Sequence, residues 1–171
     1  IAWYENDGAS DPSFTAQTIS TSADGARLVY AADIDNDGDM DVLSASYLDD
    51  KIAWYESDGA SNPSFTARTI STSADGAISV YAADVDNDGD MDVLSASYSG
   101  NTIAWYENDG AADPSFTART IATSINGAQS VYATDIDNDG DMDVLSASRN
   151  DDKIAWYEND GASDPSFTAQ T

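Results

Sequence analysis

The stretch Asp33-Ile34-Asp35-Asn36-Asp37-Gly38-Asp39-Met40-Asp41 gathers five carboxylates within nine residues, at loop positions 1, 3, 5, 7 and 9. It recurs at 84–92, with Val85 in place of Ile34, and again at 135–143. Clustered carboxylates repel one another, and hard oxygen ligands in this number suit Ca²⁺, which accepts about six to eight oxygens. Gly at position 6 permits the left-handed backbone that folds a loop around an ion. The stretch therefore predicts one Ca²⁺ per repeat loop, three in total.

The spacing also predicts how each loop residue takes part. We expect positions 1, 3, 5 and 9 to ligate through side chains, and position 7 through its backbone carbonyl while its own carboxylate faces solvent. An EF-hand would place a bidentate Glu at position 12; here Ser44, Ser95 and Ser146 stand there, so we expect position 9 to be bidentate. The alternative is a solvated acidic turn that holds no ion. The predicted metal-site residues are Asp33, Asp35, Asp37, Asp39, Asp41, Asp84, Asp86, Asp88, Asp90, Asp92, Asp135, Asp137, Asp139, Asp141 and Asp143.

Composition excludes several classes of partner and chemistry. The chain of 171 residues has 32 Asp and Glu, six Lys and Arg, and a formal net charge of -26. So few basic residues argue against nucleic acid and against anionic membrane surfaces. Cys and His are absent, which excludes disulfides and thiolate chemistry and argues against zinc.

The same features indicate an extracellular or cell-surface location. Calcium-built folds without reactive thiols suit compartments where calcium is plentiful. No apolar run approaches the length of a membrane span, so we expect no membrane insertion. The sequence starts with Ile1 and shows no export signal, and we expect such a signal to have been removed or to lie outside this sequence.

An internal repeat decides the architecture. The sequence Ile-Ala-Trp-Tyr-Glu begins at Ile1, Ile52, Ile103 and Ile154, a spacing of 51 residues each time. The chain is therefore three full repeats (1–51, 52–102 and 103–153) followed by the first 18 residues of a fourth. Residues 1–18 and 154–171 are identical.

Each repeat contains four strand-like runs separated by turn residues, which in the first copy are 1–5, 14–20, 29–34 and 42–47. Residues 48–51 then form a hairpin into the next Trp-containing strand. Four short antiparallel strands per repeat predict an all-β fold of stacked β-propeller blades. We expect the bulky residues that fill the space between blades to be Trp3, Trp54, Trp105 and Trp156. A β-solenoid is the alternative architecture.

The pattern Asp-x-Asp-x-Asp-Gly-x-x-Asp followed by Val42-Leu43, inside an all-β repeat, resembles the FG-GAP or VCBS family of integrin α-subunit and bacterial surface propellers. The resemblance covers the whole chain. It implies blades at 29–69, 80–120 and 131–171, with 1–18 as a half-blade. It also implies calcium in the loop that joins the first and second strands of each blade, held by the Asp residues at positions 1, 3, 5 and 9.

Three and a half blades cannot close a ring, since propellers usually have about four to eight. We expect either part of a longer array or a subunit that completes its blade with strands of another chain. An open blade edge is a template for strand addition, so self-association is predicted. Addition that does not close would produce a fibre.

The copies differ mainly at two places. One is Arg27-Leu28, which becomes Ile78-Ser79 and Gln129-Ser130. The other is 47–51, with its counterparts 98–102 and 149–153. These differences indicate either a binding surface that varies by blade or drift at sites without packing constraint.

The function predicted from these features is a structural or adhesive extracellular module that is rigidified by calcium, with other surface proteins as further partners. The alternative is a calcium-stabilised propeller lectin that binds glycans through Trp3-Tyr4-Glu5-Asn6-Asp7-Gly8 and its copies, unless Trp is core and Asn-Asp-Gly a turn. An enzyme is not expected, because the clustered carboxylates are explained by calcium and no nucleophile motif is present.

Overall fold

The repeats fold into three four-stranded antiparallel sheets in the computed structural model, which describes residues 1–170. Each sheet takes its first two strands from one 51-residue repeat and its last two from the next. Within these residues there is no helix, and none of the elements could therefore cross a membrane as a long apolar helix. The strands are β1 (Ala2–Asn6), β2 (Phe14–Thr18), β3 (Ala26–Ala32), β4 (Asp41–Ser46), β5 (Lys51–Ser57), β6 (Phe65–Ser71), β7 (Ala77–Ala83), β8 (Asp92–Ser97), β9 (Thr102–Asn108), β10 (Phe116–Thr123), β11 (Ala128–Thr134), β12 (Asp143–Ser148), β13 (Lys153–Asn159) and β14 (Phe167–Gln170).

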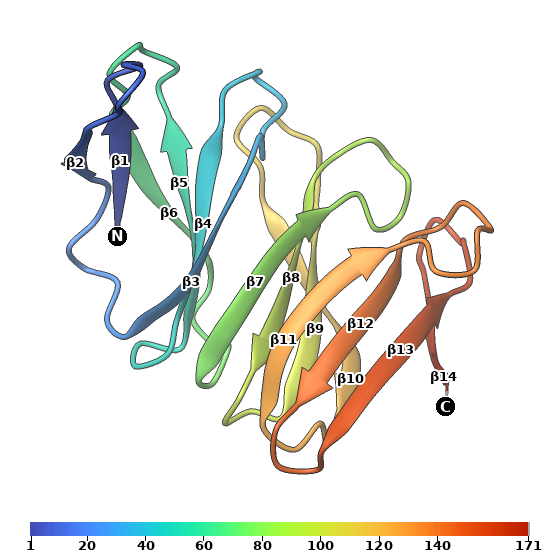
Figure 1. The fold of residues 1–171 in the computed structure, drawn as a ribbon. Helices are drawn as coiled ribbons and strands as arrows, with labels where there is room; N and C mark the ends of the chain where they lie inside the picture. Colours follow the sequence, from blue (N-terminus) through green and yellow to red (C-terminus); the bar gives the residue numbers. More distant parts are fainter. Residues whose placement is uncertain (171) are drawn as a thin grey trace.

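The sheets are three consecutive meanders, β3–β6, β7–β10 and β11–β14, preceded by the hairpin β1–β2. Figure 1 shows them arranged as a fan, with β3, β7 and β11 lying side by side as the innermost strands and the two termini at opposite ends. This arrangement confirms the all-β fold of propeller blades with a 51-residue repeat. The fan stays open and does not close into a ring.

The innermost strand begins earlier than the sequence pattern predicts. β3 starts at Ala26 rather than Val29, because Ala26 pairs with Ser46 across a β-bulge. It also ends at Ala32, before the predicted end at Ile34. Ile34 nevertheless remains fully buried, because its side chain leaves the strand and enters the core between two blades.

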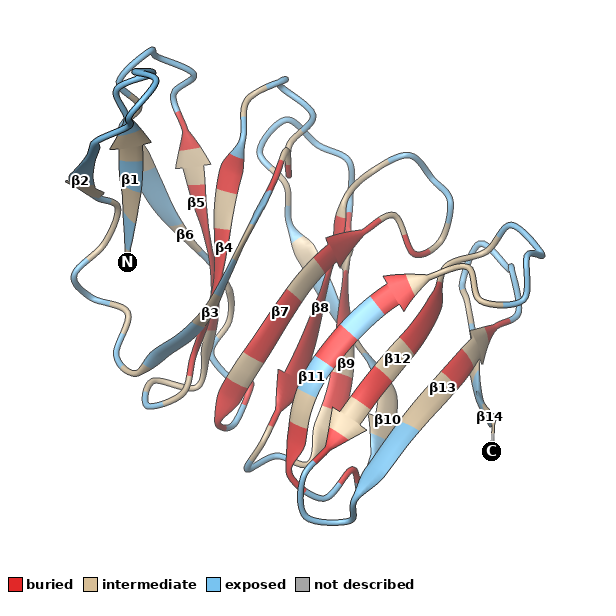
Figure 2. Cartoon of the chain, in the orientation of Figure 1, coloured by how far each residue is buried: buried red, intermediate tan, exposed pale blue. Residues whose placement is uncertain are grey.

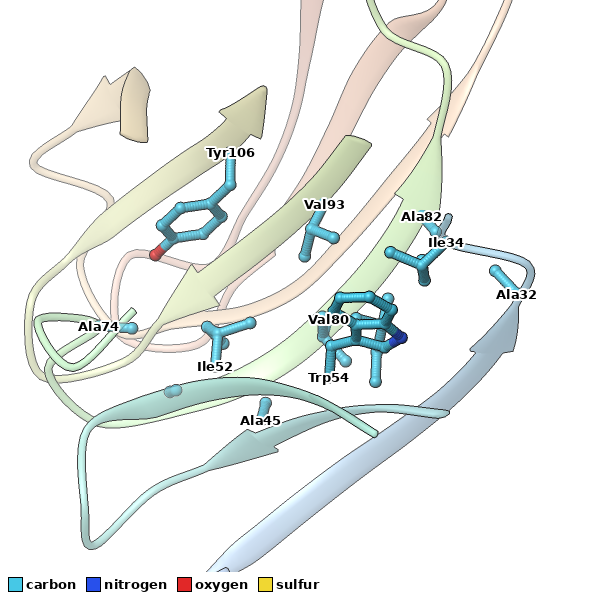
Figure 3. Close-up of a cluster of buried hydrophobic side chains, with 12 residues drawn as sticks. Ala32, Ile34, Ala45, Ile52, Trp54, Ala74, Val80, Ala82, Val93 and Tyr106 are labelled. Carbon is cyan, nitrogen blue, oxygen red and sulfur yellow. The ribbon is translucent and has the colours of Figure 1, made fainter. Parts of the chain in front are cut away.

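The core lies between neighbouring sheets rather than within one sheet. Ile52 and Trp54 project from β5 into the next blade, where Val80, Val93 and Tyr106 belong to the same buried cluster (Figure 3). The interface between the second and third blades repeats this arrangement around Trp105. Trp54 and Trp105 are each 1% exposed, which confirms their predicted role as fillers between blades.

The ends of the fan lack this cover (Figure 2). Trp3 and Trp156 are only half-buried. Ile154 is 82% exposed, whereas its counterparts Ile52 and Ile103 are fully buried. The sequence is the same in each case, so the difference arises because no blade follows β13–β14 among the described residues.

Candidate metal centre

The three Asp-rich stretches form the loops that join the first two strands of each blade, β3–β4, β7–β8 and β11–β12. In the first loop the Asp33 carboxylate accepts hydrogen bonds from the backbone N–H groups of Asp37 (3.1 Å) and Gly38 (3.0 Å). Asn36 and Gly38 both have positive φ, at 58° and 96°. The loop can therefore curl around its own first carboxylate, and the other two loops repeat these conformations and bonds.

Each loop brings three carboxylates together, with one oxygen from each residue within 4.8 Å of the others. Positions 1 and 3 belong to every group, and the third member comes from position 5 in the first loop and position 9 in the other two. The predicted position 7 residues, Asp39, Asp90 and Asp141, lie outside these groups. The groups are Asp33, Asp35 and Asp37; Asp84, Asp86 and Asp92; and Asp135, Asp137 and Asp143.

The position 9 carboxylate is buried and holds the loop to the sheet. Asp92 is fully buried, and its two oxygens accept hydrogen bonds from the backbone N–H groups of Val85 (3.0 Å) and Asn108 (2.8 Å). Asp41 and Asp143 make the same two bonds in their own blades. Burial raises the pKa of Asp92 to about 7, although the two backbone donors oppose the rise. A bound cation would offset this cost of burying a charge.

Two buried asparagines that sequence reasoning missed connect the second and third sites to the preceding blade. The Asn108 side-chain amide donates to the carbonyl oxygens of Ile34 in the first blade and Met91 in its own, both at 3.0 Å. Asn159 makes the same bonds to Val85 and Met142. The sequence pattern assigns these asparagines only to a turn. The spacing of residues within one repeat does not reveal a contact with a residue of a different blade.

The prediction that the position 7 carboxylates face solvent is wrong for Asp90 and Asp141, which bind the preceding loop. The Asn36 side-chain amide donates to Asp90 of the next loop at 2.8 Å, and Asn87 donates to Asp141 in the same way. Asp39, Asp90 and Asp141 are half-buried. Adjacent loops are therefore linked directly by a hydrogen bond.

The Trp-Tyr-Glu-Asn-Asp-Gly segments are occupied by structural contacts. Arg68 lies 5.4 Å from the Trp54 ring centre and pairs with Glu56 at 2.6 Å. The Asp58 carboxylate accepts hydrogen bonds from the Ser64 hydroxyl and from the N–H groups of Ser64 and Ala60, which close the hairpin turn and lower the Asp58 pKa. These contacts favour the interpretation of Trp as core and Asn-Asp-Gly as a turn.

The donor chemistry of the loops fits a hard divalent cation. The three groups offer carboxylate oxygens alone, and a carboxylate that already accepts two N–H bonds keeps further lone pairs. Backbone carbonyls of the loop can add to the set. Each group could hold one metal ion, and Ca²⁺ or Mg²⁺ would match its oxygen ligands.

Comparison with known proteins agrees with the repeat and the fold. The family model described as an FG-GAP-like repeat matches residues 1–44, 33–95, 84–146 and 135–171. No curated protein sequence matches the chain. Among solved structures, an Agrocybe aegerita lectin, described as specifically recognising non-reducing terminal N-acetylglucosamine, is similar with a TM-score of 0.63 and 15% identity. The similarity covers 99% of this chain and 46% of the lectin, so the chain spans about half the length of that structure.

Proposed function

Since the chain belongs to the FG-GAP-like repeat family, we propose that it is a non-enzymatic, calcium-stabilised module with a structural or adhesive role outside the cell. The observation that carries this proposal is the buried position 9 carboxylate, Asp92 and its equivalents. It joins the acidic loop to its own sheet, while the adjacent asparagine joins that sheet to the preceding blade.

Calcium would act on the loops by neutralising charge. Positions 1, 3, 5 and 9 would supply side-chain oxygens and position 7 a backbone carbonyl. The ion would allow carboxylates to remain ionised close together, and the Asn108-type bonds would carry the resulting rigidity across the blade interface. Folding would then be linked to the free concentration of the ion.

Self-association is the second part of the proposal, with another copy of the chain as the partner. On the last blade Ile154 is exposed and Trp156 is half-buried, and on the first hairpin Tyr4 and Phe14 are 64% and 59% exposed. Inside the chain, the equivalent residues meet at a blade interface, where the rings of Trp105 and Phe167 lie 6.4 Å apart in an edge-on arrangement. The two ends therefore offer complementary halves of an interface that the chain already uses.

Thermal unfolding and sedimentation, each with Ca²⁺, with Mg²⁺ and with a chelator, test the proposed function. The expected result is a melting temperature that rises with micromolar to millimolar Ca²⁺ by a saturable amount. A stability unchanged between Ca²⁺ and chelator would contradict the structural role of calcium.

The alternative function is carbohydrate binding, and one feature favours it besides the lectin of similar fold. A groove of about 600 Å³ lies between the second and third blades, with Tyr157, Phe167 and Gln170 among its lining residues. Aromatic faces beside polar groups suit sugar rings. N-acetylglucosamine is the natural first probe, and its addition should perturb the NMR signals of Tyr157 and Phe167 if the groove binds it. Unperturbed signals at saturating sugar would reject this alternative.

A further inference from the structure

The two segments at which the copies mainly differ meet in one place. A pocket of about 380 Å³ is lined by one residue near the start of each innermost strand and by the residue that directly follows each second strand. These are the same two positions at which otherwise near-identical repeats diverge. The lining residues are Arg27, Tyr47, Ile78, Tyr98, Gln129 and Arg149.

A β-bulge presents the first of these residues in every blade. The pairing of β3 with β4 skips from Ala26 to Leu28, which leaves Arg27 as the extra, bulged residue. Ile78 and Gln129 occupy the same bulge in β7 and β11. A bulge re-aims the side chain that it carries, and bulges are common beside functional sites. The backbone therefore keeps one presentation while the side chain changes from blade to blade.

The pocket is cationic in a strongly acidic chain. It contains two of the six basic residues, Arg27 and Arg149, and none of its lining residues is acidic. In the described residues, Lys51, Arg68 and Arg119 make ion pairs with carboxylates, but Arg27 and Arg149 make none. Both arginines are exposed residues.

Aromatic and polar groups complete the lining. The Arg27 guanidinium lies 5.0 Å from the centre of the Tyr47 ring, and the rings of Tyr47 and Tyr98 are 6.4 Å apart. The Tyr98 phenol group donates to Asn150 at 3.4 Å. Gln129 adds an amide that can donate to and accept from hydroxyl groups.

We propose that this pocket binds an acidic monosaccharide unit, a sugar ring that carries a carboxylate. Arginine recognises carboxylates through paired N–H donors, which supplies the anionic half of the specificity. The tyrosine rings offer apolar faces to the sugar ring, and the Gln129 amide reaches its hydroxyl groups. The pocket lies at the end of the blades opposite the Asp-rich loops, because β3 runs from the bulge at Arg27 towards the loop after Ala32. It is also separate from the groove beside Tyr157, so the inference is independent of calcium binding and of that groove.

Drift without function would not predict this combination. The variable segments do contain acidic residues, at Asp49, Asp50, Asp151 and Asp152, but none of these lines the pocket. Instead, positions from three blades place cations and aromatic rings around one pocket.

The test uses glucuronate as the probe, in calcium-containing buffer, with binding followed by NMR and calorimetry. The copies themselves supply substitutions that the fold accepts: Arg27→Gln introduces the residue of the third copy, and Arg149→Tyr introduces that of the first two. The matched control, Lys51→Thr with Lys153→Thr, also removes two positive charges, but outside the pocket. The residue introduced is Thr, which the second copy has at this position as Thr102.

We expect the R27Q/R149Y variant to bind glucuronate at least about tenfold more weakly than the unchanged protein, and the control to bind as the unchanged protein does. Glucose should bind far more weakly than glucuronate, and so should inorganic sulfate. Absence of glucuronate binding, equal binding by R27Q/R149Y, or equal affinity for glucose or sulfate would each overturn the proposal. Circular dichroism of every variant establishes that the fold is retained.

Discussion

Asp92 combines three properties: it is ionisable, it is fully buried, and both of its oxygens accept backbone hydrogen bonds. The bonds favour the ionised carboxylate, whereas burial disfavours it, and burial is the larger effect on its pKa. A positive charge nearby would therefore favour the ionised Asp92 carboxylate that holds the loop to the sheet.

The dependence of stability on pH follows from this balance in the calcium-free protein. The pKa of Asp92 is raised to about 7, and burial also raises the pKa of Asp41 and Asp86. A carboxyl group whose pKa is higher in the folded protein than in the unfolded chain makes its full contribution to stability below its pKa in the unfolded chain. This contribution is lost as pH rises through its pKa in the folded protein. The pKa values of Asp58 and Asp109 are lowered, so their contribution is lost only as pH falls below the ordinary Asp range.

We therefore expect the chelated protein to be most stable near about pH 4 to 5 and to lose stability towards pH 8. Because protons and the ion compete for the same oxygens, the increase in melting temperature caused by Ca²⁺ should grow over that range. Thermal unfolding followed by circular dichroism across pH, with and without chelator, measures both effects. A chelated protein that becomes steadily more stable from pH 5 to pH 8 would contradict this explanation.

Replacing Asn108 by Ala should loosen the connection between the first two blades. The substitution removes the side-chain amide that donates to the carbonyl oxygens of Ile34 and Met91. These two oxygens then lack that donor at a buried interface. The expected loss in the free energy of unfolding is about 1–3 kcal/mol, and it is measured by denaturant titration.

Asn6→Ala is the matched control for this prediction. Asn6 occupies the same place in the repeat and makes the same local bond to a glycine N–H, but it is exposed on the first hairpin. Its replacement should change the free energy of unfolding by no more than about 0.5 kcal/mol. Equal losses for the two variants would show that the bonds between blades contribute nothing beyond the local turn.

At the scale of the strand, identical sequences have different energetic roles according to their place in the fan. Trp105 in β9 is buried between blades, and Trp156 in β13 is half-exposed at the end. Trp105→Ala should lower the free energy of unfolding by about 3–5 kcal/mol, because it leaves a cavity in the core. Trp156→Ala should cost clearly less, and chemical denaturation of both variants measures the difference. Equal costs would mean that the blades do not share their core as described.

The sequence was sufficient for the strands, the repeat and the place of the acidic loops. Alternation and turn residues are local signals, and a spacing of 51 residues between copies of one motif identifies the repeating unit without a structure. The Asp-rich loop could be placed between two strands because apolar runs flank it on both sides. These features depend on neighbours along the chain.

Contacts between blades could not be predicted from neighbours along the chain. The bonds from Asn108 to Ile34 and from Asn36 to Asp90 each join residues more than 50 positions apart, so local sequence patterns do not reveal them. The left-handed conformation of Asn36 was also missed, although Asn adopts it more readily than most residues. The bulge at Arg27 likewise depends on the pairing register of β3 with β4 rather than on local composition.

At the scale of the whole molecule, the open fan leaves two apolar ends that a second copy could cover. Ile154→Lys places a charge on one end without disturbing the fold, since this side chain is 82% exposed. It should weaken self-association at least about tenfold, as measured by sedimentation across protein concentration. Leu48→Lys, at an exposed hairpin, should leave association unchanged. Equal association of both variants would place the contact elsewhere.

The central claim is that each acidic loop binds one calcium ion and that this binding stabilises the blades. Isothermal titration of the chelator-treated protein with Ca²⁺ tests it most directly. We predict a stoichiometry of three ions per chain, one for each of the three carboxylate groups, with a matching rise in melting temperature. A titration without saturable binding, or binding that leaves the melting temperature unchanged, would contradict the claim.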